Sequence, residues 1–248
     1  MRRWRLWTSL AMHDIASRYR GSVLGPFWIT VTTSAMIGGI GLMYSQLLRT
    51  SLQEYIPWLA TGIVLWTLFS QLITEGCDSF ISSGPLIRQT AIPMLSFIAR
   101  MVTRNLINFA HQIVIVVAVI VYFGVWRVWD PLLAVVGLVL VIVNLCWIAL
   151  ISGIVSARFR DVPQIIAALV QVSMFITPVF WRPEAIVSHR FVLHWNPFYH
   201  MLEVTRRPLL GEHVSWKSYA LLLGMAAVGW LIAFALFSRA RRRVVHYL

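Results

Sequence analysis

The stretch Ser17-Arg-Tyr-Arg-Gly-Ser-Val-Leu-Gly-Pro-Phe-Trp28 separates a basic N-terminal segment from a long uncharged run. That run extends from Pro26 to Leu48 without a charged side chain, and about 20 apolar residues suffice for a helix to cross a bilayer. Gly21 and Gly25, together with the proline that follows them, allow the chain to bend between the two parts. The sequence therefore predicts an amphipathic helix in the membrane interface over residues 2–20, followed by a first membrane crossing.

The composition is that of a multi-spanning membrane protein. Of the 248 residues, 59% are hydrophobic and only 12% are charged, whereas about a quarter of the residues of soluble domains are charged. The net charge of +12 comes almost entirely from arginines that are scattered between apolar stretches. That pattern is typical of loops anchored at a membrane surface and disfavours a nucleic-acid partner.

Six apolar stretches are long enough to be membrane-crossing helices. Their predicted ranges are 26–48, 55–74, 94–123, 132–156, 162–181 and 217–238. Between the last two lies a segment, 182–216, that is neither fully apolar nor like a soluble domain. The predicted fold class is an all-α polytopic membrane protein in which a single transmembrane domain covers residues 1–248.

An even number of crossings places both termini on the same side of the membrane. On that side lie 14 of the 21 basic residues, and seven lie on the other, so the excess of positive charge predicts cytoplasmic termini. The seven are Arg49, Arg127, Arg182, Arg190, Arg206, Arg207 and Lys217.

The chain lacks the lysine that a phosphate-binding P-loop requires. Its only lysine, Lys217, follows a tryptophan rather than the glycine of a Gly-Lys-Ser/Thr motif. Any ATP-driven motor must therefore be another polypeptide, and a motor needs a docking surface. The cytoplasmic loop 82–93 is bounded by helix breakers and offers apolar side chains next to Arg88, although it could also be a surface turn without a partner.

Several stretches resemble permease subunits of ABC-2 type polysaccharide exporters. Arg18 to Trp28 is similar to the family pattern R-Y-R-G-S-x-L-G-x-x-W, and Arg158-Phe-Arg-Asp161 looks like its R-D signature at the end of the fourth crossing. Asn196-Pro-Phe-Tyr-His200, followed by Glu203 and Arg206, resembles an outer region that forms short re-entrant helices in this family. The resemblance runs from the interface helix to the basic C-terminal tail.

This resemblance implies a transport subunit rather than an enzyme. The expected substrate is a lipid-linked polysaccharide of the O-antigen or capsule type, exported across the bacterial inner membrane. The expected partners are a second copy of the chain, two ATP-binding subunits that hold ATP and Mg, and membrane lipids, so we expect no cofactor on the chain itself. The implied contacts with the ATPase are Leu86, Ile87, Arg88 and Gln89. The implied outer segment residues are Asn196, Pro197, Glu203 and Arg206.

Two further groups of residues are expected to meet the cargo. The orientation places Arg18, Tyr19 and Arg20 at a cytoplasmic gate where an anionic cargo would arrive, with membrane anchoring as the competing interpretation. Aromatic faces can stack on sugars, and polar side chains inside a crossing face protein or water rather than lipid. The channel-lining candidates, which could equally be interface anchors or interhelical contacts, are Trp28, Tyr44, Trp66, Asn108, Gln171 and Phe175.

Other functions stay open from the residues alone. The same architecture could export teichoic acid or another amphiphile, or could form a passive channel. A membrane enzyme acting on lipid-linked sugars would need convergent acids, and Glu75 and Asp78 are the only close pair near an interface. Three histidines between residues 189 and 200 show no common face, so no metal site and no catalytic residue are expected.

Overall fold

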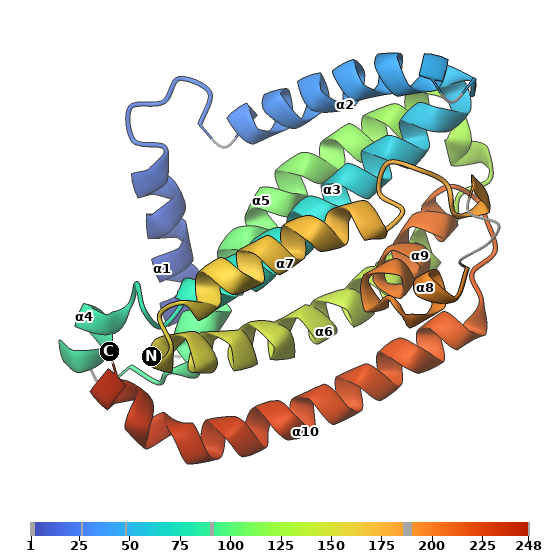
Figure 1. The fold of residues 1–248 in the computed structure, drawn as a ribbon. Coiled ribbons are helices and arrows are strands. Elements are labelled where there is room, and N and C mark those ends of the chain that lie inside the picture. Colours follow the sequence, from blue (N-terminus) through green and yellow to red (C-terminus); the bar gives the residue numbers. More distant parts are fainter. Residues whose placement is uncertain (1–2, 26, 48, 90–91, 186–189, 248) are drawn as a thin grey trace.

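The computed structural model describes residues 3–25, 27–47, 49–89, 92–185 and 190–247, and every regular element in these ranges is a helix (Figure 1). The elements in chain order are α1 (Arg3–Arg18), α2 (Phe27–Leu47), α3 (Leu52–Asp78), α4 (Gly84–Gln89), α5 (Leu95–Tyr122), η1 (Val125–Arg127), α6 (Pro131–Arg158), α7 (Val162–Ile176), η2 (Pro183–Ala185), α8 (Arg190–Trp195), α9 (Pro197–Leu209) and α10 (Trp216–Tyr247). The prediction of an all-α chain is confirmed for these ranges.

Five of these helices are long and apolar enough to cross a membrane: α2, α3, α5, α6 and α10. The chain runs back and forth along the bundle, and its two ends lie at the same end of it (Figure 1). We call this the terminal end, where α1 and α4 also lie, and we call the end that holds α8 and α9 the opposite end. Length and composition thus mark the chain as a polytopic membrane protein.

The fifth predicted crossing, residues 162–181, is not helical throughout. Helix α7 ends at Ile176 after 15 residues, which corresponds to roughly 22 Å and is shorter than the hydrocarbon core of about 30 Å. Thr177 has extended dihedral angles (φ −86°, ψ 138°) because it precedes Pro178, whose ring disfavours the helical region for the residue before it. By length and composition five helices can cross a membrane and α7 is a shorter apolar helix, so the sixth crossing stays a prediction.

Other element boundaries also differ, most of all at α10, which continues beyond the predicted residue 238 to Tyr247. The interface helix ends at Arg18 rather than at residue 20, because the chain turns through Gly21 at φ +84°, a conformation that favours glycine. Helix α3 continues beyond the predicted residue 74 to Asp78. The predicted boundaries at residues 2, 26 and 48 lie outside the described residues.

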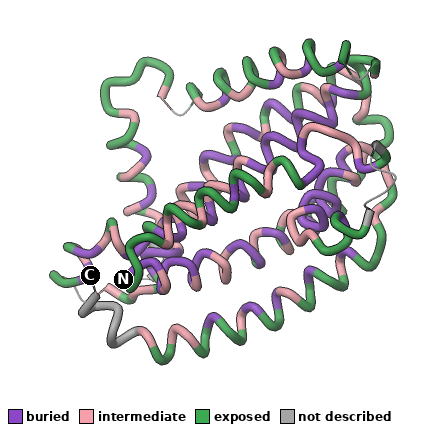
Figure 2. The backbone as a smooth tube through the Cα atoms, in the orientation of Figure 1, coloured by how far each residue is buried: buried purple, intermediate pink, exposed green. Residues whose placement is uncertain are grey.

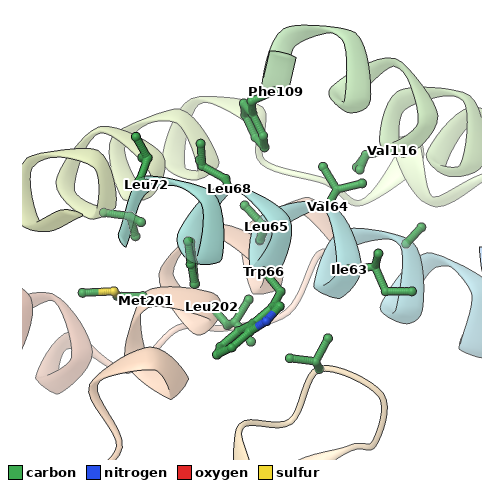
Figure 3. Close-up of a cluster of buried hydrophobic side chains, with 14 of the residues drawn as sticks. Ile63, Val64, Leu65, Trp66, Leu68, Leu72, Phe109, Val116, Met201 and Leu202 are labelled. Atoms are coloured by element: carbon green, nitrogen blue, oxygen red, sulfur yellow. The ribbon is translucent and has the colours of Figure 1, made fainter. Parts of the chain in front are cut away.

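Helix α3 is the centre of the bundle. In its most apolar 18-residue window 78% of the residues are buried, against 17% for α2 and 22% for α10, so α3 is surrounded by protein and the outer two helices are not (Figure 2). Its buried side chains, Leu65 and Trp66 among them, pack between α5 on one side and α9 on the other (Figure 3). This packing brings α1, α3 and α5 together at the terminal end, and α3, α7 and α9 together at the opposite end.

Candidate functional site

A network of charged side chains joins α1, α3 and α5 at the terminal end. The Asp14 carboxylate on α1 accepts hydrogen bonds from Arg100 (Nε–Oδ2, 2.7 Å, with a second contact through Nη2) and from Arg104 (Nη1–Oδ2, 3.1 Å). Arg104 also donates to Oε2 of Glu75 on α3 at 2.6 Å, and Asn105 donates to the same oxygen at 2.7 Å. Two carboxylates therefore hold two arginines of α5 between two neighbouring helices.

Helical spacing produces this network. Arg100 and Arg104 are four residues apart and project from the same face of α5. On α1, Ala11 and Ile15 are buried against the bundle, and Asp14 lies on the same face as both. Burial alone would raise the pKa of Asp14, but the hydrogen bonds and positive charges of the two arginines outweigh it and lower that pKa below its ordinary value.

A polar cleft of about 350 Å³ lies beside this network. Its lining includes Arg18, whose guanidinium is 4.0 Å from Glu75, and the exposed carboxylate Asp78. Of the three residues predicted at a cytoplasmic gate, Arg18 alone is part of this lining, whereas Tyr19 is half-buried and Arg20 is exposed in the turn that follows α1. The remaining lining consists of Ser79, Ser82, Ser83, Phe97, Met101 and the two arginines of α5.

The four predicted ATPase contacts form the short helix α4, which also lies at the terminal end (Figure 1). Ile87 is buried and packs with Phe97 and Ile98 of α5, and Leu86 is half-buried against the same cluster. Arg88 and Gln89 are exposed. The apolar side chains therefore attach α4 to the bundle, and the polar ones are those that can be reached from outside.

The predicted channel residues divide into two groups. Trp28 and Tyr44 on α2, and Gln171 and Phe175 on α7, are exposed on the surface of the chain. Trp66 is buried and packs edge-on against Phe198 of α9, with ring centroids 5.5 Å apart. Asn108 is also buried, and its side-chain oxygen has no hydrogen-bond partner among the described residues.

The predicted outer-segment residues come together at the opposite end. Asn196 caps α9 by accepting from the Phe198 amide at 2.9 Å, and Pro197 occupies the first helical turn, where proline is favoured. Glu203 forms an ion pair with Arg207 one turn later on the same helix. Arg206 is fully buried and its guanidinium lies 4.2 Å from the centre of the Trp58 ring on α3.

Sequence reasoning missed the residues of α3 that complete this arrangement. Tyr55 and Trp58 are almost fully buried and donate hydrogen bonds to backbone carbonyls beyond α7. In the sequence Trp58 lies near the start of the second predicted crossing, where a tryptophan is typical of an interfacial anchor. The only signal in the sequence was the pair of prolines, Pro178 and Pro183, which bracket residues that could not continue a helix.

The two acids named for the enzyme alternative, Glu75 and Asp78, both line the polar cleft. Glu75 is paired with Arg104 and Asn105, while Asp78 is exposed in the cleft. The His200 ring contacts the Ser218 hydroxyl at 2.9 Å and the His194 carbonyl at 3.0 Å. No group of three metal-ligating side chains occurs within the described ranges, and residue 189 lies outside them.

The chain is similar to known transport proteins along most of its length. A family model described as "ABC-2 type transporter" matches residues 5–210. The O-antigen export system permease protein RfbA of Myxococcus xanthus is 22% identical over 233 residues, which cover 93% of this chain and 89% of that protein. A Klebsiella pneumoniae protein of the same name is 20% identical over 241 residues, covering 95% and 92%. The polysialic acid transport protein KpsM of Escherichia coli is 22% identical over 211 residues, covering 84% and 82%.

Proposed function

The chain belongs to the ABC-2 type transporter family, and from that premise we propose that it is the membrane-spanning permease subunit of a polysaccharide exporter. The cargo is a lipid-linked glycan of the O-antigen or capsule type. The observation that carries this proposal is similarity along nearly the whole chain to relatives named as O-antigen export permeases and as a polysialic acid transport protein. The chain itself forms the path that the glycan takes through the membrane, and it does not hydrolyse ATP.

A separate ATP-binding subunit drives transport from the terminal end. The sequence lacks the Gly-Lys-Ser/Thr motif, so ATP and Mg belong to that partner. Helix α4 is its docking element, because Arg88 and Gln89 are exposed there while Ile87 anchors the helix to the bundle. The arginine excess supports a cytoplasmic terminal end in the inner membrane. In this proposal α7 and the non-helical residues after it together make the sixth crossing.

The glycan path lies between two copies of the chain, each paired with one ATPase subunit. Helices α2 and α7 carry exposed apolar and aromatic side chains, among them Trp28, Tyr44 and Phe175. At Gly38 and Gly39 of α2 nothing lies within contact distance of an added Cβ, so these small residues are not used for packing inside the chain. They are available for close approach of a second copy.

The cleft beside the ion network is where the anionic headgroup of the cargo arrives. Arg18 lies at its edge with a side chain that is about half exposed (55%). Arg20 is exposed two residues later, in the turn that follows α1, and adds a second positive charge to this part of the chain. These arginines meet the cargo in this proposal, and membrane anchoring is the competing role for them.

Reconstitution with the cognate ATPase tests the proposal. We expect the ATPase to co-purify with the chain, and a lipid-linked glycan to cross proteoliposomes only when ATP is present. Glycan movement without ATP would support a passive channel. ATP-dependent movement of teichoic acid but not of the glycan would show that the proposed cargo is wrong. Chemical modification of the glycan, abolished when Glu75 and Asp78 become amides, would support the enzyme alternative.

A charge reversal on α4 tests the docking surface. Arg88→Glu is expected to release the ATPase during purification, because it places a negative charge on the exposed side of α4. The matched control is Arg127→Glu, an equally exposed arginine at the opposite end, which should leave the complex intact. Equal amounts of ATPase on both variants would contradict docking at α4.

A further inference from the structure

Residues 177–182 form a non-helical strap of turns and bends between α7 and η2, at the opposite end of the bundle (Figure 1). Thr177, Pro178 and Val179 are buried, so this non-helical backbone lies inside the protein. Backbone groups at membrane depth must find partners within the protein, because hydrocarbon offers none. The backbone groups of the strap therefore need hydrogen-bond partners from neighbouring parts of the protein.

Four consecutive carbonyl groups of the strap accept hydrogen bonds from side chains. Arg206 donates to the carbonyl of Pro178 (Nη1–O, 2.6 Å) and to that of Val179 (Nη2–O, 3.4 Å). The Tyr55 hydroxyl donates to the carbonyl of Phe180 at 2.8 Å, and Nε1 of Trp58 donates to that of Trp181 at 3.3 Å. Side chains of α3 and α9 thus replace the backbone donors that a continued helix would have supplied.

Arg206 is an unusual choice for this role, because its charge is fully buried. Among the described residues no carboxylate lies within ion-pair distance of it, and its Nε has no hydrogen-bond partner. The guanidinium lies instead over the Trp58 ring at 4.2 Å, and Arg182 lies 5.4 Å from the same ring. Burying an uncompensated cation is costly, so stability alone does not explain an arginine at this position.

The surrounding backbone is shaped to admit the guanidinium. Gly62 on α3 faces Arg206, and a Cβ added there would overlap the guanidinium nitrogen Nη2 and approach the Val179 carbonyl oxygen to 2.6 Å. At the other end of the strap, Asn196 donates from Nδ2 to the Thr177 hydroxyl at 2.9 Å. The strap is consequently attached to α3 and to the start of α9 at the same time.

We propose that Arg206 is a positioning residue that holds the strap across the opposite end of the bundle, at the outer end of the glycan path. This role rests on the proposed function, in which the exposed face of α7 borders that path. The planar fork of arginine can reach two neighbouring carbonyls at once, whereas the ammonium of lysine acts as a point charge. Arg206→Lys therefore keeps the positive charge and loses the geometry that fixes the strap.

Cysteine labelling measures whether the strap is held. In a chain whose two cysteines, Cys77 and Cys146, are changed to alanine, Val179→Cys places a thiol at a position with 0% exposure. Reaction with a membrane-impermeant maleimide added from outside then requires the strap to open. We expect Arg206→Lys to raise the labelling rate at this site by at least about ten-fold, the effect of losing one hydrogen bond to a charged group.

Two controls separate local release from general loosening. Val141→Cys on α6 is equally buried, so its labelling rate should not change when Arg206→Lys is introduced. Arg207→Lys, which alters the neighbouring arginine paired with Glu203, should leave Val179→Cys unreactive. If Arg206→Lys does not accumulate in the membrane, Tyr55→Phe removes the Phe180 bond without leaving a buried charge and should raise labelling in the same way.

The outcomes distinguish this role from the transport function. Unchanged labelling of Val179→Cys in Arg206→Lys and in Tyr55→Phe would overturn the positioning role. An equal rise at Val141→Cys would overturn it as well, because Arg206 would then only stabilise the whole fold. The assay needs neither ATP nor glycan, so a failure of glycan export in reconstituted vesicles would refute the proposed function without affecting the labelling result.

Discussion

Asp14→Asn is the substitution whose effect can be worked out most completely from the structure. Asp14 is the carboxylate by which α1 is paired to α5, and the side chains involved are only 13% exposed for Asp14 and 23% for each arginine. The amide that replaces the carboxylate leaves Arg100 and Arg104 without this counter-charge, one helical turn apart. Other α1 contacts, including the buried side chains of Ala11 and Ile15 and the Arg18 guanidinium 4.0 Å from Glu75, are unchanged by this substitution.

The size of the effect follows from the burial of the pair. Removing one partner of a fully buried ion pair costs about 3–5 kcal/mol, whereas exposed pairs contribute up to about 1 kcal/mol. With partial exposure and with Glu75 still bound to Arg104 at 2.6 Å, we expect a loss of about 2 kcal/mol for docking of α1. That loss corresponds to a roughly 30-fold increase in the population of undocked α1.

Hydrogen exchange of the purified complex measures this population. Amides of α1 should exchange roughly 30-fold faster in Asp14→Asn, whereas those of the central α3 should not change. Asp78→Asn is the matched control, because Asp78 lines the same cleft and is exposed. Equal exchange of α1 in wild type and Asp14→Asn, or an equal increase in Asp78→Asn, would refute the proposed docking by the ion network.

The pH dependence of the same contact has a defined sign. Because the pKa of Asp14 is lowered in the folded state, its contribution to docking is fully present above the ordinary carboxyl pKa of about 3.9 and is lost as pH falls through the still lower folded value. Docking of α1, after correction for intrinsic exchange, should therefore be constant from about pH 7 to about pH 5. A progressive release of α1 over that range would mean that Asp14 is not held by its arginines.

The remaining predictions concern the cleft and the packing of the bundle. Replacing Arg18 and Arg20 together by glutamine should lower glycan export in vesicles while membrane insertion and ATPase binding persist, and Arg18→Gln alone should account for most of the loss because Arg18 lines the cleft. Unchanged export in the double variant would mean that Arg18 and Arg20 act only as membrane anchors. Gly76→Ala should lower the Tm, at a cost of about 1–3 kcal/mol, because its Cβ would lie 2.8 Å from the Ala149 backbone. Gly224→Ala, with open space around it, should raise stability slightly in the same thermal assay, and equal shifts of both would contradict the close approach of α3 and α6.

Much of the architecture follows from local sequence alone. An uncharged run such as residues 27–47 has few ways to satisfy its backbone in lipid other than a helix, so the five candidate membrane spans could be predicted from length and hydropathy. The outer segment 182–216 was recognised because it is neither fully apolar nor like a soluble domain and resembles the family there, and the structure shows Asn196 and Pro197 at the start of α9. These features depend on residues that are neighbours in the chain.

The partners of the buried charges depended on tertiary structure. Arg100 and Arg104 could be placed on one face of α5 from their spacing, but that Asp14 lies opposite them, 86 residues away for Arg100, follows only from the way α1 packs on α5. In the same way, Arg206 was predicted only as part of the outer segment and Trp58 lies near a predicted membrane boundary, and the two become partners only when α9 packs on α3. Hydropathy and spacing report the local environment of a residue, whereas a hydrogen bond between distant segments requires the relative positions of whole helices.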